Sequence, residues 1–140
     1  MVRISNLELL KILRKNSRIP FLKIAKALGA SETAIRKRIR KLERDGIIRK
    51  YTIDVDPKKI GFEIDVFIGI DVKPEYYIST LERLKNMSEI INLYSTSGDH
   101  MFIIECWFRD TKELTKFVEA LKKLEGITRV CPAIILEKIK

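Results

Sequence analysis

Apolar residues recur at helical spacing in three short stretches near the start of the chain. The first follows Ser5, a residue type that caps helices, and continues to about Asn16. The second begins at Pro20 and ends at Gly29, the residue type that most readily closes a helix in the left-handed conformation. The third follows Ser31, another favourable cap. This pattern predicts two helices joined by a short glycine turn, which is a helix-turn-helix arrangement.

The third predicted helix divides into one apolar stripe and a basic remainder. Ile35, Ile39 and Leu42 form the stripe, and Arg38 lies close enough to it to be predicted as a structural residue. A basic helix that follows a turn in this way suits the major groove of DNA, where Arg and Lys donate to bases and phosphates. The residues predicted to contact DNA are Ser31, Glu32, Thr33, Arg36, Lys37, Arg40 and Lys41.

The pattern changes from helical to alternating after Gly46. Tyr51, Ile53 and Val55 alternate with polar residues, which predicts a half-buried strand inside a linker of about residues 47–56. A turn-forming segment that contains a proline and ends at Gly61 follows. We therefore expect an N-terminal domain over residues 1–61 and a second domain over residues 62–140.

The second domain shows strand and helix patterns in the order βαββαβ. Strands are predicted over 62–73, 90–96, 100–108 and 127–138, and helices over 76–87 and from a cap at Thr111 to Gly126. Pro132 places the last strand at an edge or a bulge, because proline cannot donate to a sheet. This is the order of a ferredoxin-like fold, with both helices on one face of an antiparallel sheet. The predicted fold class is α+β, with a helix-turn-helix domain before the ferredoxin-like domain.

The other face of this sheet is expected to be uncovered and yet apolar. Phe67, Gly69, Met101, Ile103 and Trp107 lie on it, or their neighbours do if the register is shifted by one residue. An apolar patch of that size usually marks an association surface. We expect a homodimer formed by sheet-to-sheet packing, which would suit two half-sites in an inverted repeat of double-stranded DNA.

The charge distribution indicates a polyanionic partner for the first domain. The chain carries a formal net charge of +9, with 17 Lys and Arg against 6 Asp and Glu in residues 1–61, and 11 against 13 in residues 62–140. A thermophile-like charged surface would mix both signs in both halves. The whole excess lies in the helix-turn-helix half, which favours nucleic-acid binding.

The remaining composition excludes several classes of protein. Apolar residues make up 46% and charged residues 34%, as in an ordinary globular protein. No apolar run approaches the ~20 residues of a membrane span, and no signal peptide is recognisable, so we expect a cytoplasmic protein without a membrane partner. The spacing of Cys106 and Cys131 indicates neither a disulfide framework nor a metal site. We expect no cofactor, no metal and no catalytic residues, since neither cysteine has an evident partner base.

Several segments resemble the Lrp/AsnC, or feast/famine, family of transcription regulators. They are Lys15-Asn16-Ser17-Arg18, Leu28-Gly29-Ala30-Ser31 and Arg38-Ile39-Arg40-Lys41-Leu42-Glu43 in the first half, and Ser97-Gly98-Asp99 between the central strands of the second. The resemblance covers essentially the whole chain. It implies a winged helix-turn-helix, a linker strand that pairs between subunits, and RAM-domain dimers that often assemble into octamers.

The resemblance also implies an amino-acid effector bound between RAM domains at Ser97, Gly98, Asp99 and His100. Backbone donors at a glycine turn can bind a carboxylate, and Asp99 can bind an ammonium. Many family members carry a second acidic residue two positions after this aspartate, where the present chain has Met101. This departure leaves the identity of the effector open. The alternative for Gly98 and Asp99 is a hairpin turn without a ligand.

Two other functions stay open on the sequence alone. An architectural DNA-compacting protein would share the charge and the oligomer but would bind with little sequence preference. Siroheme decarboxylases share the two-domain plan but use histidines around the first domain, whereas the single histidine here is His100 in the second. The residues and the resemblance together favour a sequence-specific DNA-binding regulator modulated by a small molecule.

Overall fold

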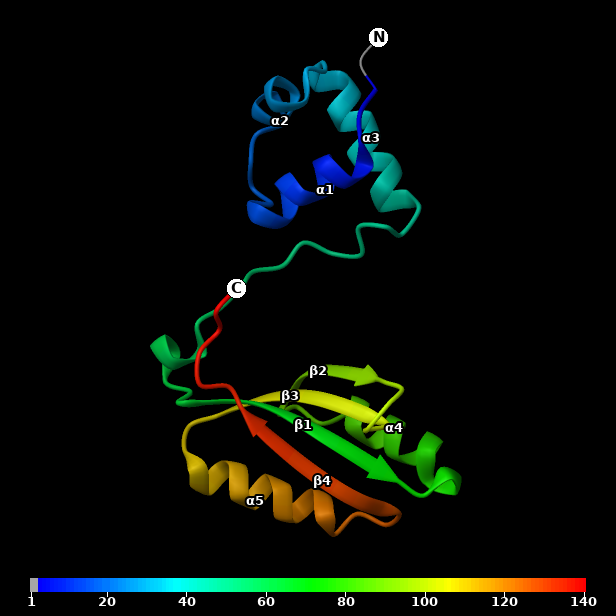
Figure 1. Ribbon diagram of the computed structural model, residues 1–140, viewed down its shortest axis with the longest axis vertical. Coiled ribbons are helices and arrows are strands. Elements are labelled where there is room, and N and C mark those ends of the chain that lie inside the picture. The colour runs from blue at the N-terminus through cyan, green and yellow to red at the C-terminus, as the bar shows by residue number, and fades with distance from the viewer. Residues whose placement is uncertain (1–2) are drawn as a thin grey trace. The chain divides into compact units, whose positions relative to one another are not determined.

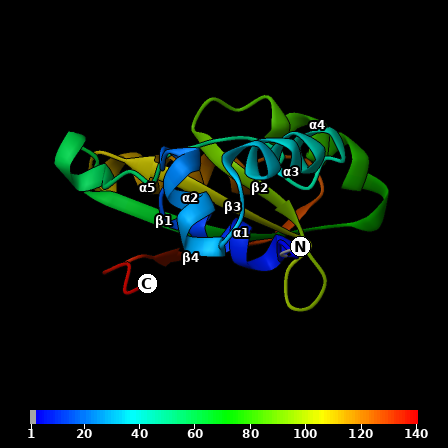
Figure 2. The ribbon, with the colours of Figure 1, turned by 90° about the horizontal axis from the view of Figure 1, so that it is seen from above.

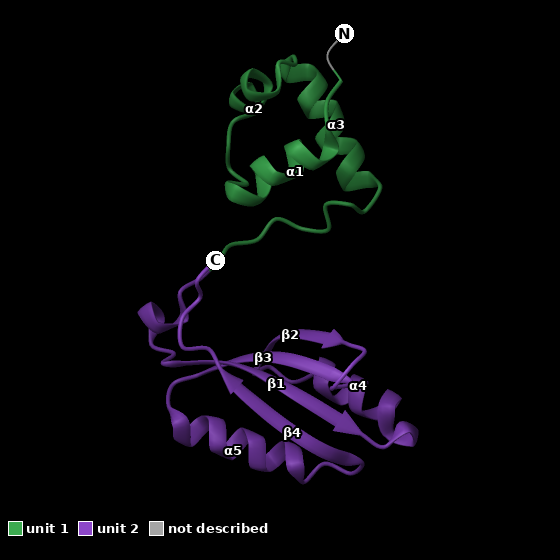
Figure 3. Cartoon of the chain, in the orientation of Figure 1, with its two compact units in different colours: residues 1–54 green, residues 55–140 purple. Residues whose placement is uncertain are grey.

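The computed structural model describes residues 3–140, which divide into two compact units (Figure 1, Figure 3). The first unit ends at Asp54 and the second spans Val55–Lys140. The segment Pro57–Ile60, which the sequence pattern assigns to the first domain, forms a short 3-10 helix and belongs to the second unit.

Three helices make up the first unit, α1 (Asn6–Lys15), α2 (Phe21–Leu28) and α3 (Glu32–Arg44) (Figure 1, Figure 2). The predicted caps are confirmed, because Ser5 accepts from the Glu8 N–H at 3.3 Å and Ser31 from the Ala34 N–H at 3.1 Å. Gly29 ends α2 in the left-handed conformation, at φ 65°.

The three helices enclose an apolar core, whose fully buried members are Leu9, Ile24, Ile35 and Leu42. The Arg38 guanidinium donates to the Ile4 carbonyl at 2.9 Å and to Asn6 Oδ1 at 2.8 Å. These bonds link α3 to the segment that begins α1, so the structural role predicted for Arg38 is confirmed.

The predicted strand in the linker is not formed within the described residues 3–140. None of the four strands pairs with residues 47–56, and Ile53 is 80% exposed. The polar and apolar residues do alternate, but a strand needs a neighbouring strand to bond its backbone groups, and this segment has none among the described residues. Pairing of the linker between subunits stays a prediction.

The second unit is a four-stranded antiparallel sheet in the order β2-β3-β1-β4 (Figure 1). Its elements are β1 (Ile64–Val72), α4 (Tyr77–Lys85), β2 (Ile90–Ser95), β3 (Phe102–Phe108), α5 (Thr111–Lys122) and β4 (Ile127–Ile134). The βαββαβ order and the α+β class are as predicted. Pro132 lies in β4, an edge strand, which confirms the edge interpretation.

Several element ends differ from the sequence prediction. A 3-10 turn, Pro74–Tyr76, precedes α4, and the cap of α5 is Asp110 rather than Thr111, because Asp110 Oδ1 accepts from the Glu113 N–H at 2.9 Å. The strand expected from residue 100 begins at Phe102, and the last strand ends at Ile134. The residues lost from β3 belong to the turn that closes the β2–β3 hairpin.

The alternation predicted for the sheet is confirmed. Val66, Ile68 and Ile70 of β1 and Phe102 and Ile104 of β3 are fully buried in one cluster with residues of α4 and α5. Their neighbours Phe67, Ile103 and Trp107 lie on the opposite face, as expected from a period of two.

Met101 departs from the expected placement on the open face. It lies before β3, packs against the core cluster, and its sulfur accepts from the Val72 N–H at 3.4 Å.

Candidate functional site

The outer face of α3 carries all the residues predicted to contact DNA. Each of them is exposed, whereas the stripe of Ile35, Ile39 and Leu42 is buried against the other helices. The side chains that would contact a groove therefore share one solvent-facing surface, which we call the basic face of α3 (Ser31–Lys41, without the stripe and Arg38).

Arg36 is oriented on the basic face by two neighbours. Its Nη2 lies 2.8 Å from Glu32 Oε1, and its guanidinium carbon lies 5.5 Å from the centre of the Phe21 ring. Glu32 thus contacts Arg36 one helical turn away, and Phe21 supports the guanidinium from α2. The fork of N–H donors points in a defined direction before any ligand binds.

The other predicted contact residues differ in their partners. The Ser31 hydroxyl caps α3, and Lys41 bonds Asp45 at 2.8 Å, which lowers the pKa of the Asp45 carboxyl below its usual value. Within residues 3–140, Lys37 and Arg40 have no ion-pair partner. The charges of these two side chains are therefore available to a polyanion.

The second candidate site surrounds the turn between β2 and β3. The Thr96 hydroxyl donates to the His100 carbonyl at 2.6 Å, and the Thr96 N–H bonds the Met101 carbonyl at 3.0 Å. Gly98 takes a φ of 115°, a conformation that other residue types rarely adopt. The turn thus exposes Ser97, Gly98 and Asp99 and directs the His100 side chain inward.

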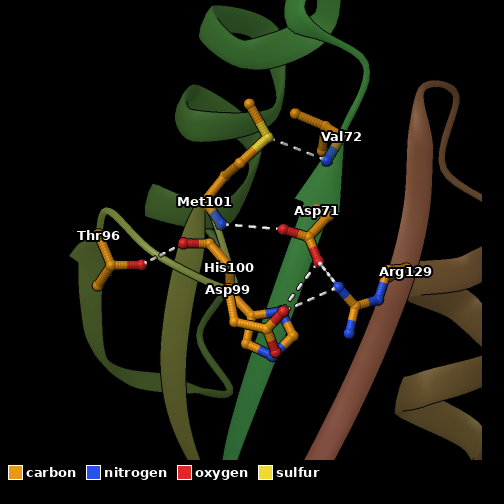
Figure 4. Close-up of polar contacts among 7 residues, drawn as sticks. All are labelled: Asp71, Val72, Thr96, Asp99, His100, Met101 and Arg129. Carbon is orange, nitrogen blue, oxygen red and sulfur yellow. Dashed lines mark hydrogen bonds and ion pairs between the residues drawn. The ribbon is translucent and has the colours of Figure 1, made fainter.

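Asp71 of β1 lies at the centre of this site (Figure 4). Its carboxylate, 13% exposed, accepts from the Met101 N–H at 3.0 Å and faces His100 Nδ1 at 2.9 Å and Arg129 Nη1 at 3.5 Å. A carboxylate so far removed from water needs such partners. Asp71 therefore connects three separate parts of the domain, namely β1, the turn and β4.

His100 fills the space between two carboxylates and a glycine. Its Nδ1 faces Asp71 and its Nε2 lies 3.3 Å from Asp99 Oδ2. The imidazole ring therefore lies between the carboxylates of Asp71 and Asp99. A Cβ at Gly69 would overlap the imidazole ring, so the ring can lie here only because position 69 is glycine.

Asp99 is already paired in this structure. Arg129 Nη1 donates to Asp99 Oδ1 at 3.3 Å, and this bond keeps the pKa of Asp99 below its ordinary value. Both side chains are largely exposed, Arg129 by 50% and Asp99 by 76%. We refer to Asp71, Asp99, His100 and Arg129 as the turn cluster.

Sequence reasoning found the turn but missed Asp71 and Arg129. These two residues pair directly across β1 and β4, next to an irregularity in the register at Asp71 and Val72. Their charges at the ends of two predicted strands were a weak signal, because only the register places them beside each other and beside the turn.

A third polar group lies on the open face of the sheet. Asn92 donates to Glu105 Oε1 at 2.9 Å, and Asp65 lies on the neighbouring strand. Burial and the nearby Glu105 carboxyl raise the pKa of Asp65 to about 7. Asp65 Oδ1 and Trp107 Nε1 are buried without a hydrogen-bond partner in the described part of the chain.

The described residues 3–140 contain no helix with the length and apolar character of a membrane span. Nor do any three His, Cys, Asp or Glu side chains among them lie together as a metal site would require.

Comparison with known proteins relates both units to one family. Residues 3–49 match the model described as a winged helix-turn-helix DNA-binding domain, and residues 65–140 match the Lrp/AsnC ligand binding domain. The HTH-type transcriptional regulator LrpA of Pyrococcus horikoshii is 47% identical over 133 residues, which cover 94% of either chain. The regulator Ptr1 of Methanocaldococcus jannaschii is 32% identical, over 96% of this chain and 92% of its own.

Solved structures show the same arrangement of elements within the chain. AsnC of E. coli has a TM-score of 0.80 and 30% identity, and the match covers 99% of this chain and 95% of AsnC. A transcriptional regulator of Neisseria meningitidis, solved as a complex with L-Met, has a TM-score of 0.85 at 18% identity, over 99% of this chain and 93% of its own.

Proposed function

Because the chain belongs to the Lrp/AsnC family of DNA-binding transcription regulators, we propose that the basic face of α3 contacts the bases of its operator. We propose in addition that an amino acid or related small molecule binds at Ser97–His100 and modulates DNA binding. The observation that carries the first proposal is the separation of α3 into a buried stripe and a basic, exposed face.

Each residue of the basic face has a role in this proposal. Arg36, directed by Glu32 and Phe21, donates in a fork to a guanine, and Thr33 contacts a base or a phosphate. Lys37, Arg40 and Lys41 neutralise phosphates and fix the position of the helix on the duplex. Ser31 contributes through its cap rather than through a direct contact.

We further propose that the protein acts as a homodimer in the cytoplasm, without catalytic activity. Phe67, Ile103 and Trp107 give the open face of the sheet an apolar centre that a second copy of the chain would cover. Two basic domains related by a two-fold axis would then contact an inverted repeat.

The effector class is supported by a relative and by the charges of the site. The Neisseria meningitidis regulator with this fold is known as a complex with L-Met. In the present chain the turn brings Asp99 and Arg129 within 3.3 Å of each other at the surface, so one acceptor and one donor of opposite charge lie side by side. Such a pair complements a small zwitterion.

The variant Arg36→Ala tests the base-contact proposal. We expect cognate binding to weaken by about 1–3 kcal/mol and discrimination at one base position to be lost, measured by fluorescence anisotropy on cognate and single-substitution duplexes. Arg109→Ala, which removes an exposed arginine of the other domain, is the matched control and should bind like the wild type. An equal loss on every duplex would make Arg36 a phosphate contact.

The net positive charge of the first unit also fits an architectural role, in which phosphate contacts provide nearly all the affinity. The two roles differ in the ratio of specific to non-specific binding. An architectural protein would show a steep dependence on salt and no preference among duplexes.

A further inference from the structure

We infer that Arg129 is the carboxylate-binding residue of the effector site, beside Asp99, for which the family resemblance already implies ammonium binding. An α-amino acid would enter by separating the Arg129–Asp99 ion pair and bonding to both partners. This inference rests on the proposed function, since it names the groups by which the proposed effector is recognised.

The ion pair that must open is the most exposed contact of the turn cluster. Arg129 Nη1 and Asp99 Oδ1 are 3.3 Å apart, with the two side chains 50% and 76% exposed. Exposed pairs of this kind contribute little to stability, because water solvates both charges well and ordering two long side chains costs entropy. Opening the pair therefore requires little free energy.

Arg129 would stay in place when the pair opens. Its Nη1 also lies 3.5 Å from Asp71 Oδ2, and Asp71 is fixed by the Met101 N–H and by His100. Both carboxylate contacts of Arg129 use Nη1, so Nη2 and Nε have no acceptor in the described part of the chain. An arginine with two open donors is suited to bind a carboxylate in a fork.

The exposed pair favours a zwitterion over a simple anion or cation. Arg129 and Asp99 offer a ligand one cationic and one anionic group side by side. A ligand with one carboxylate and one ammonium replaces the Arg129–Asp99 ion pair by two ion pairs, one to each residue. The net charge of the site does not change. A ligand that lacks either group leaves Arg129 or Asp99 without its new partner.

The test combines a change in the ligand with a change in the protein. Full-length wild type is titrated calorimetrically with the common L-amino acids, and each one that binds is compared with its carboxamide, which keeps the ammonium and side chain but lacks the carboxylate. We expect the acid to bind at least about tenfold more tightly than the amide. In Arg129→Ala the acid should lose that advantage, so that acid and amide bind alike.

Two further variants make the result specific. Arg129→Lys keeps the charge but loses the fork and should recover only part of the preference for the acid. Arg109→Ala, a change just beyond the far end of β3, should keep the full preference for the acid over the amide. Because Arg129 is half-exposed, Arg129→Ala should remain folded, and a melting curve like that of the wild type confirms this before titration.

The outcomes separate this inference from the proposed function. If an amino acid binds and Arg129→Ala keeps the full preference for the acid over the amide, the role of Arg129 is wrong while amino-acid sensing stands. If no L-amino acid binds the wild type, the proposed effector class is wrong, and the inference is overturned with it.

Discussion

At the scale of single residues, the turn cluster depends on one glycine. Gly69 lies in the middle of β1 with an ordinary strand conformation, so its backbone does not require glycine. The requirement is the His100 ring, which occupies the space a Cβ would need and thereby brings its nitrogens to Asp71 and Asp99. Neither residue's role follows from a local pattern, because the contact joins a residue inside β1 to a residue of the turn before β3.

The variant Gly69→Ala tests this packing. We expect a loss of about 1–3 kcal/mol in the free energy of unfolding, because the new methyl group must displace the imidazole from a filled site. Urea unfolding at one fixed protein concentration provides the measurement.

The control for that prediction is the same substitution in a His100→Ala background. With the ring removed, the added methyl group meets no obstacle, and the double variant should be no less stable than His100→Ala alone. If Gly69→Ala costs the same in both backgrounds, the ring is not the cause.

At the scale of elements, the sequence predicted the helix ends and the buried residues of the strands, because both depend on local chemistry. Ser5, Ser31 and Gly29 determine helix ends through their own side chain or backbone, and the period of two along β1 determines which of its residues are buried. The sequence pattern placed the start of β3 and the cap of α5 wrongly. At both points neighbouring residues compete for the same backbone hydrogen bonds. At α5, Asp110 rather than Thr111 bonds the Glu113 N–H.

The open face of the sheet gives a prediction about pH. The folded pKa of Asp65, about 7, lies above its ordinary value of 3.8, so the folded state binds this proton more tightly than the unfolded state. The contribution of Asp65 to stability is therefore present below pH ~4 and is lost as the pH rises toward ~7. Asp65→Asn, which cannot ionise, should lose less stability than the wild type between about pH 5 and pH 8.

Thermal unfolding of both proteins across that pH range, at equal concentration, checks this expectation. Glu63→Gln, an exposed carboxyl close to the same strand, is the matched control and should follow the wild-type curve. Parallel curves for wild type and Asp65→Asn would show that Asp65 titrates as an ordinary carboxyl.

At the scale of the whole molecule, the sequence predicted two domains and their order but could not supply contacts that a second copy makes. The linker around Tyr51 and Ile53 has the alternation of a strand but no strand partner within the part of the chain that the structure describes. Phe67, Ile103 and Trp107 form an apolar centre on the face of the sheet that no helix covers in the described residues. Both features are expected of a chain that completes its structure by association.

The variant Trp107→Glu tests that association. A charge at the centre of the apolar face would have to be buried in a sheet-to-sheet dimer, so we expect a lower mass by multi-angle light scattering at the same concentration. Ile78→Glu, which introduces the same charge at a 68% exposed apolar position of α4, should leave the mass unchanged. An unchanged mass for Trp107→Glu would place the subunit interface elsewhere.

Selection from a random pool of duplexes measures whether the chain recognises a particular base sequence. The full-length protein is incubated with the pool at about 0.15 M salt, and the bound duplexes are sequenced over successive rounds. We expect an enriched inverted repeat, bound about a thousandfold or more tightly than a scrambled duplex of equal composition. A bound pool with no enriched sequence would contradict base recognition by the basic face of α3 and leave only phosphate binding.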